Sequence, residues 1–139
     1  MLELKDFEAA YNKVQEVVLP TKLIKSDYFS DQTGNDVYLK PENMQLTGAY
    51  KIRGAYYKIS TLSEEEKAKG LITASAGNHA QGVALAAARQ GVKATIVMPT
   101  TTPLLKVNRT KDLGAEVILH GDVYDEACAH ALDLAAEHG

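Results

Sequence analysis

Between residue 70 and the end of the chain, short apolar runs alternate with longer segments that have helical spacing. The apolar runs are residues 71–74, 94–98 and 116–119. The segments with helical spacing are residues 78–90, 102–114 and 122–138. Strands separated by helices form right-handed crossover units, in which the strands are parallel and the helices cover the sheet. The pattern therefore predicts a three-layer α/β fold, a parallel sheet with helices on both faces.

Residues that cap helices mark where several of these segments begin. Ser63, followed three positions later by Glu66, forms a capping box that opens a short helix before the first strand. Thr102 is expected to cap the second long helix, with Pro103 at the first helical position. Asp122 is expected to cap the last helix.

The first forty residues show a different pattern. Residues 6–18 predict an amphipathic helix with Asp6 as its N-cap. The apolar stripe of this helix consists of Phe7, Ala10, Tyr11, Val14, Val17 and Val18. Residues 30–36 form a cluster of turn-forming types, and residues 37–40 predict a short strand. The regular alternation of strands and helices begins only after this part.

Composition and charge exclude several classes of function. The chain has 139 residues, enough for one domain with a hydrophobic core. Its formal net charge of −3, without a basic block, argues against binding to nucleic acid. No apolar run approaches the ~20 residues that span a bilayer, and the first residues lack the pattern of a signal peptide. Cys128 is the one cysteine, which excludes an internal disulfide, and we expect a cytoplasmic protein.

Lys51 is the first candidate for chemistry. It stands among small and apolar residues in Gly48–Ala55 and follows the polar run Glu42–Gln45. It also falls in the first turn of a predicted helix. Burial disfavours an ammonium group and favours the free amine, which is the form that a Schiff-base lysine needs. An ordinary surface lysine on a helix is the alternative.

The segment Ser75–His79 is the second candidate, because it follows a predicted strand and opens a predicted helix. Ligands of open α/β sheets bind at the carboxyl ends of the strands, and N–H groups at a helix N-terminus favour an anion. Gly77 lets the backbone approach a ligand closely, while Ser75 and Asn78 offer a hydroxyl and an amide. A plain strand-to-helix turn with a capping serine or asparagine is the alternative.

These two segments, in this order, resemble the signature of the threonine ammonia-lyase (threonine dehydratase) family. Its members are pyridoxal-phosphate enzymes of the tryptophan synthase β-like fold, also called fold type II. The matching stretches are Tyr50–Ala55 and Ser75–His79, and the similarity continues through Pro41–Gln45 and Gly114–Gly121. The resemblance implies pyridoxal 5'-phosphate as the cofactor.

The resemblance also implies a role for each matching residue. Lys51 would hold the cofactor through its amine and remove the Cα proton of an amino acid substrate. Tyr50 stands where the family usually has a phenylalanine whose ring packs against the pyridine, and Asn78 would hydrogen-bond the phenolic oxygen. The pocket for the substrate carboxylate would be lined by Ser75, Gly77, Asn78 and His79.

The implied reaction is deamination of L-threonine to 2-oxobutanoate, and of L-serine to pyruvate, with release of ammonia. 2-Oxobutanoate enters isoleucine biosynthesis or arises in threonine breakdown. Serine racemases and serine dehydratases of the same family are an alternative, but racemases carry a serine where this chain has Ala76. A non-catalytic α/β domain is the other alternative. A nucleotide-binding module is disfavoured, because neither Gly-x-Gly-x-x-Gly nor a phosphate-loop pattern occurs.

Family members of this type are more than twice as long, so we expect the chain to be the N-terminal part of such an enzyme. Residues 1–40 would be an arm that belongs to the large domain, and residues 41–139 would be the small α/β domain. The rest of the large domain would be absent. A helix without its partner domain exposes its apolar face, and we expect a homo-oligomer.

Other polar residues have simpler interpretations. No metal site is expected from Cys128 and His130, because residues two positions apart point to different faces of a helix. Arg53 is expected on a helix surface or as an anchor for backbone groups, with a phosphate contact as the lesser alternative.

Overall fold

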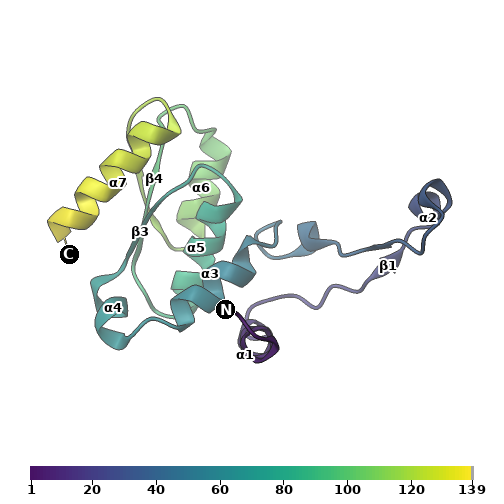
Figure 1. Cartoon of the computed structure of the whole chain (residues 1–139). Helices are drawn as coiled ribbons and strands as arrows, with labels where there is room; N and C mark the ends of the chain where they lie inside the picture. Colours follow the sequence, from purple (N-terminus) through teal and green to yellow (C-terminus); the bar gives the residue numbers. More distant parts are fainter. Residues whose placement is uncertain (139) are drawn as a thin grey trace.

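The structure is a computed structural model that describes residues 1–138 and shows an α/β body from which a thin arm projects (Figure 1). We call residues 22–40 the hairpin arm. It contains β1 (Ile24–Lys25), α2 (Asp27–Thr33) and β2 (Tyr38–Leu39). The remaining elements are α1 (Leu4–Val14), the 3-10 helix η1 (Glu42–Met44), α3 (Lys51–Ser60), α4 (Glu64–Lys69), β3 (Leu71–Ala74), α5 (Asn78–Arg89), β4 (Ala94–Met98), α6 (Leu104–Asp112), β5 (Glu116–Leu119) and α7 (Tyr124–His138).

The sheet of the body has the order β3-β4-β5 and is parallel, as the alternating pattern predicts. Ile96 in the central strand is opposite Thr73 on one side and Val117 on the other. The three strands and the helices that follow them lie within the residues expected from the sequence. In the hairpin arm, β1 and β2 pair in antiparallel fashion, with Ile24 opposite Leu39.

Helices cover both faces of this sheet, which confirms the three-layer arrangement. Alternate strand residues point to opposite faces, so each face has its own core. On one face, Ile96 and Met98 are fully buried in the larger core, which α3, α5 and α6 complete. On the other face, Val97 packs against Ala127 and Ala131 of α7.

Small side chains determine how α5 packs. The helix is buried over most of its length, and many of its buried residues are alanines. These are Ala80, Ala84, Ala86 and Ala87. Because an alanine adds only a methyl group to the helix surface, the backbone of α5 can lie close to the sheet on one side and to α3 on the other.

Helix α1 differs from its prediction at both ends. It begins at Leu4, with Glu3 as N-cap and Asp6 as the third residue of a capping box, so the assignment of Asp6 as N-cap was wrong. The helix ends at Val14 because the chain then turns. Val14 and Val17 are buried against the body, whereas Phe7 and Tyr11 of the same predicted stripe are mostly exposed. Only the C-terminal part of the apolar stripe therefore packs against the body.

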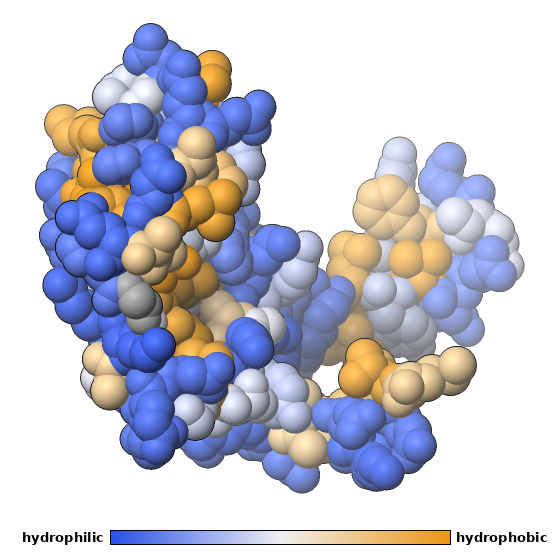
Figure 2. Space-filling view, turned by 60° about the vertical axis from the view of Figure 1, so that its left-hand side comes forward, coloured by the Kyte–Doolittle hydropathy of each residue, from blue (hydrophilic) through white to orange (hydrophobic). Residues whose placement is uncertain are grey.

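The hairpin arm contains a helix that the turn-rich composition of residues 30–36 concealed. Ser26 caps α2 by accepting a hydrogen bond from the Phe29 N–H at 3.3 Å, and Gly34 ends it at a φ of 67°. The last four residues of α2 lie in the segment predicted as a turn, so that prediction was wrong for them. Apolar side chains at the arm are exposed to solvent, as Figure 2 shows. They are Leu23, Ile24, Tyr28, Phe29, Tyr38 and Leu39.

Besides Asp6, two of the three other predicted helix caps were wrong. The capping box of Ser63 and Glu66 forms as expected. Thr102 does not cap α6, because Pro103 is the N-cap residue and the Thr102 hydroxyl is buried without a hydrogen-bond partner among the described residues. Asp122 lies one residue too early to be the N-cap of α7, and its carboxylate accepts a hydrogen bond from the Thr100 hydroxyl at 2.9 Å.

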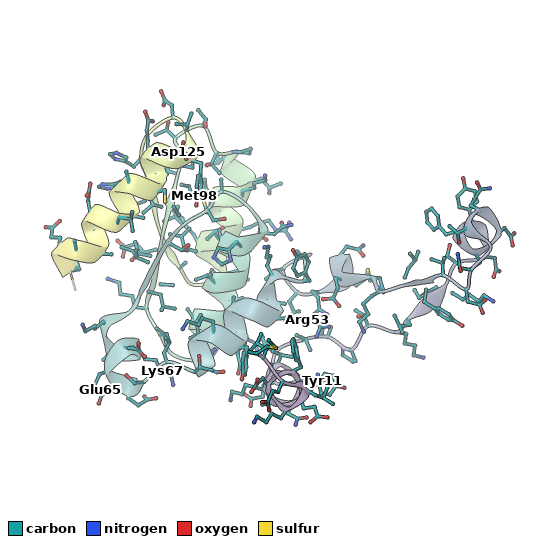
Figure 3. The ribbon with its side chains drawn as sticks, viewed as in Figure 1. Tyr11, Arg53, Glu65, Lys67, Met98 and Asp125 are labelled. Carbon is teal, nitrogen blue, oxygen red and sulfur yellow. The ribbon has the colours of Figure 1, made fainter. Side chains whose placement is uncertain are left out.

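A group of polar side chains fastens the start of the hairpin arm to α3. The Glu42 carboxylate accepts hydrogen bonds from Arg53 Nε at 2.8 Å and Nη2 at 2.9 Å, and one from the Thr21 hydroxyl at 3.2 Å. The buried amide of Gln45 binds both the N–H and the carbonyl of Leu19. Arg53 lies on the side of α3 that faces the arm (Figure 3). Arg53 is thus an anchor, although for Glu42 rather than for backbone groups.

Replacing Glu42 is expected to destabilise the chain in a pH-dependent way. The Arg53 guanidinium holds the pKa of Glu42 at about 2, below its ordinary value of 4.5. Such a shift stabilises the fold above pH ~4.5 and is lost as the pH falls toward ~2. We expect Glu42→Gln to lower the free energy of unfolding at neutral pH by about 1 kcal/mol, because solvent screens this partly exposed pair, and by far less near pH 2.5. Urea unfolding at both pH values measures this.

Glu8→Gln serves as the control for this experiment, because Glu8 is exposed on α1 and the substitution is chemically the same. We expect no comparable pH-dependent loss from it. If Glu42→Gln lost the same stability at both pH values, the ion pair with Arg53 would not be the cause.

Candidate functional site

Two helices begin side by side at the candidate site. Helix α3 begins at Lys51, and α5 begins at Asn78 directly after the loop that leaves the carboxyl end of β3. The two helices pack along each other, and Gly82 of α5 lies against the backbone of Lys51. Each helix N-terminus carries a partial positive charge, so the two together favour an anionic ligand.

Lys51 lies at the first helical position of α3 and is exposed. Its Nζ atom is 5.3 Å from the centre of the Tyr50 ring, which is itself mostly exposed. The described residues therefore do not provide the buried environment from which the sequence analysis argued for a free amine. They provide an accessible amine beside an aromatic ring.

Ser75 organises the loop between β3 and α5. Its Oγ atom accepts hydrogen bonds from the Gly77 N–H at 3.3 Å and from the Ala80 N–H at 3.2 Å. Ser75 thus accepts a hydrogen bond from an N–H of the first turn of α5, but the N-cap residue is Gly77, not the serine or asparagine that the simpler interpretation expected. A hydroxyl that accepts two bonds still carries its own proton, which it can donate to a carboxylate. Ser75 can therefore bind this N–H group and a ligand at the same time.

Gly77 leaves open space in front of the loop. A Cβ atom added at this residue would meet no protein atom within 4 Å, and its φ of −135° suits any amino acid. The fold itself therefore does not demand glycine here. A ligand that approaches the loop backbone would give a reason for it, because a side chain would fill the space that the ligand needs.

His79 connects the loop electrostatically to Lys51. Partial burial lowers the pKa of the imidazole, and the positive charge of Lys51 lowers this pKa further. Both effects keep His79 neutral at neutral pH, when its ring can donate one hydrogen bond and accept another. Asn78 is exposed at the first position of α5, on the same turn.

The structure thus places the two predicted segments next to each other, although they are far apart in the sequence. Lys51 is near Tyr50 and His79, while Ser75 and Gly77 shape the loop before α5. Gly82, whose contact with Lys51 brings the two segments together, was not predicted from the sequence. Its position one helical turn after Asn78 was the only sign of this role in the sequence.

Two hollows on the surface are lined mainly by other residues, and Tyr50 is shared between the site and the first hollow. One, of about 520 Å³, lies between α1 and the start of α3 and is lined in part by Tyr50, Glu42 and Arg53. The other, of about 290 Å³, lies at the amino end of the sheet, where Leu71 meets the end of α7. The second hollow is at the end of the strands away from the Ser75 loop, so we attach no role in this site to it.

Within the described residues, no three His, Cys, Asp or Glu side chains gather in a way that could hold a metal ion. His120 and His130 stack with ring centres 3.9 Å apart. In the same part of the chain, no helix combines the length and the apolar character that crossing a bilayer requires.

Comparison with known protein families identifies the group to which these residues belong. The family model described as pyridoxal-phosphate dependent enzyme matches residues 14–139. The chain belongs to this family. The match includes both helix starts and the loop before α5, so the residues of the candidate site lie inside the family's shared region.

Individual relatives agree with this assignment. The chain is 52% identical to an L-threonine ammonia-lyase of Thermotoga maritima and to a catabolic L-threonine dehydratase of Staphylococcus aureus (strain N315). It matches over its whole length but covers only 35% and 40% of these proteins. Among solved structures, threonine deaminase isoform 2 of Solanum lycopersicum is 43% identical with a TM-score of 0.87, and maize serine racemase is 32% identical with a TM-score of 0.90. In both comparisons, the match covers 99% of this chain and 42% of the other chain.

The donor groups fit one side of pyridoxal phosphate. An accessible amine can react with the aldehyde of this cofactor, and the Tyr50 ring beside it can lie against an aromatic ring. Two helix N-termini and the Ser75 hydroxyl suit a carboxylate next to the amine. No run of glycines that could wrap a dianionic phosphate occurs among the ten glycines of the chain.

Proposed function

We propose that the whole protein is a pyridoxal-phosphate-dependent ammonia-lyase that acts on L-threonine and also on L-serine. One observation carries this proposal. The amine of Lys51 lies beside the N-terminus of α5 in a chain that is 52% identical to an L-threonine ammonia-lyase. The products would be 2-oxobutanoate or pyruvate, together with ammonia.

Each residue of the site has a part in this proposal. Lys51 would hold the cofactor through its amine, and its freed amine would take the proton from Cα of the substrate. The bound cofactor supplies the electron sink that makes this proton acidic. Ser75 and the N–H groups at the start of α5 bind the substrate carboxylate, with Gly77 leaving room for it. Asn78 would donate a hydrogen bond to the phenolic oxygen of the cofactor, and His79, whose pKa is lowered, would line the carboxylate pocket in its neutral form.

Serine racemisation is the second candidate function, because maize serine racemase has nearly the same fold over this region. The residue before Gly77 separates the two proposals. A racemase needs a second base on the opposite face of the substrate, and the serine of family racemases supplies it at the position of Ala76. A methyl group cannot accept a proton, so Ala76 supports the lyase.

We further propose that residues 1–40 associate with a large domain and that residues 41–139 form the small domain. The exposed apolar residues of the hairpin arm support this division. A loop beyond this small domain would bind the cofactor phosphate.

We also propose a homo-oligomer, with the exposed Phe7 and Tyr11 on α1 near the contact. Two metabolic roles fit the product, isoleucine biosynthesis and threonine breakdown, and the catabolic name of the Staphylococcus aureus relative supports the second.

The first prediction concerns the residue that carries the cofactor. Borohydride reduction of the whole protein loaded with pyridoxal phosphate, followed by peptide mapping, should place the label on Lys51. We expect the label there because Lys51 lies at the start of α3, beside the loop before α5. Lys40 and Lys58 are internal controls in the same experiment, and a label on either one in place of Lys51 would reject the assignment.

A second prediction concerns the choice between the two reactions. In the whole protein, Ala76→Ser should raise the formation of D-serine relative to pyruvate, because a hydroxyl then stands on the opposite face of the substrate. Chiral chromatography of the products from L-serine measures this ratio. An unchanged ratio would show that Ala76 does not decide between deamination and racemisation.

A third prediction concerns the 139-residue chain by itself. It should fold but bind little pyridoxal phosphate and release no detectable 2-oxobutanoate from threonine, because it has no run of glycines that could wrap the dianionic phosphate. Absorbance of the added cofactor and an assay for 2-oxo acids test this together. Stoichiometric binding with turnover would mean that residues 1–139 hold a complete site.

A further inference from the structure

Gly82 is the point at which α5 touches the backbone of the lysine-bearing helix. A Cβ atom added at Gly82 would lie 3.1 Å from the carbonyl carbon of Lys51, 3.2 Å from its carbonyl oxygen and 3.2 Å from the Ile52 nitrogen. All three are backbone atoms, which cannot turn aside as the end of a side chain can. Such distances are shorter than most Cβ contacts in proteins, so a methyl group here would displace α3 by a few tenths of an ångström.

The first turn of α3 is packed into the core, so its position depends on its neighbours. Ile52 follows Lys51 directly and is completely buried in the main core. Ala55, one turn further along α3, is also buried. The packing around these residues holds the first turn of α3 against α5, so the contact at Gly82 determines where the backbone of Lys51 lies.

Gly82 also lies on the side of α5 that carries the proposed ligand-binding residues. It follows Asn78 by four positions and His79 by three, and residues at these spacings share one face of a helix. The same face therefore presents the loop end of α5 to the ligand and the Gly82 backbone to Lys51. A change at Gly82 alters the separation of Lys51 from this loop directly.

We infer that Gly82 is a positioning residue, which sets the distance between the Lys51 amine and the ligand-binding loop at residues 75–79. The inference rests on the proposed function for its catalytic meaning, since it assumes that Lys51 is the cofactor lysine. The geometric part can be tested without cofactor or substrate. Gly82 acts through Lys51 and need not touch the reacting atoms.

Gly54 provides a matched control for Gly82. Both glycines lie inside helices, so replacing either by alanine gives the same gain in helix propensity. A Cβ atom at Gly54 would meet nothing within 4 Å, in contrast to one at Gly82. Any difference between Gly82→Ala and Gly54→Ala therefore results from the contact between residue 82 and the backbone of α3, and not from the loss of a glycine.

The readout is the pKa of His79, measured by NMR titration of the histidines in the 139-residue chain. Because the charge of Lys51 and partial burial both lower this pKa, moving α3 away from α5 should raise it. We expect a higher pKa in Gly82→Ala than in the wild type, and no change in Gly54→Ala. Lys51→Gln, which removes the charge, should also raise it.

Each possible result either supports or refutes the positioning role of Gly82. A wild-type pKa of His79 in folded Gly82→Ala, with a raised pKa in Lys51→Gln, would refute the positioning role. An unchanged pKa in Lys51→Gln would show that the two side chains do not interact, which removes the basis of the inference. Failure of Gly82→Ala to fold, with a normal Gly54→Ala, would make Gly82 a purely structural residue. None of these results depends on where the borohydride label lies, so failure of the proposed function remains separately visible.

In the whole protein, Gly82→Ala should change kcat more than KM. Displacing a reacting group by about 1 Å can cost on the order of 100-fold in rate. A shift of a few tenths of an ångström should therefore lower kcat of Gly82→Ala several-fold, with a smaller change in KM. Equal values for Gly82→Ala and Gly54→Ala would contradict a role in positioning.

Discussion

The backbone contact between α5 and α3 is the constraint on which the candidate site depends. The alanines of α5 let it lie close to the sheet, and the absence of a side chain at Gly82 lets α3 lie close to α5. The lysine and the loop before α5 come from separate parts of the sequence. The packing of α3 against α5 therefore brings the lysine close to this loop. The sheet contributes only by holding α5 in place.

Local signals were enough to predict the body of the fold. Each strand from residue 71 onward is a short apolar run with a glycine or proline near it, and each helix has its own spacing. The hairpin arm lacked such signals. None of the residues of α2 is buried, so no apolar stripe marked it, although Ser26 and Gly34 stood at its two ends. The cap predictions at Thr102 and Asp122 failed because both helices begin one residue later than expected, and the Asp122 carboxylate accepts a hydrogen bond from Thr100 instead.

The sequence indicated the candidate residues but not their arrangement. The motifs around Lys51 and Ser75 are local, so the sequence alone could point to them. The Glu42–Arg53 ion pair and the contact at Gly82 join residues that are distant in the sequence, and no local pattern predicts such contacts. The expected burial of Lys51 is also absent from residues 1–138, since burial depends on everything that surrounds the side chain.

The pairing of Gln45 with Leu19 has a consequence for engineering. One side-chain amide binds both backbone groups of Leu19, as a neighbouring strand would, and so closes a loop whose ends stay together. Lengthening a closed loop costs little free energy, because the entropy of closure grows only slowly with length. In the 139-residue chain by itself, the tip of the arm around Gly34 should therefore accept an inserted peptide, such as an epitope or a fluorophore site, while the lysine and its neighbouring loop keep their places.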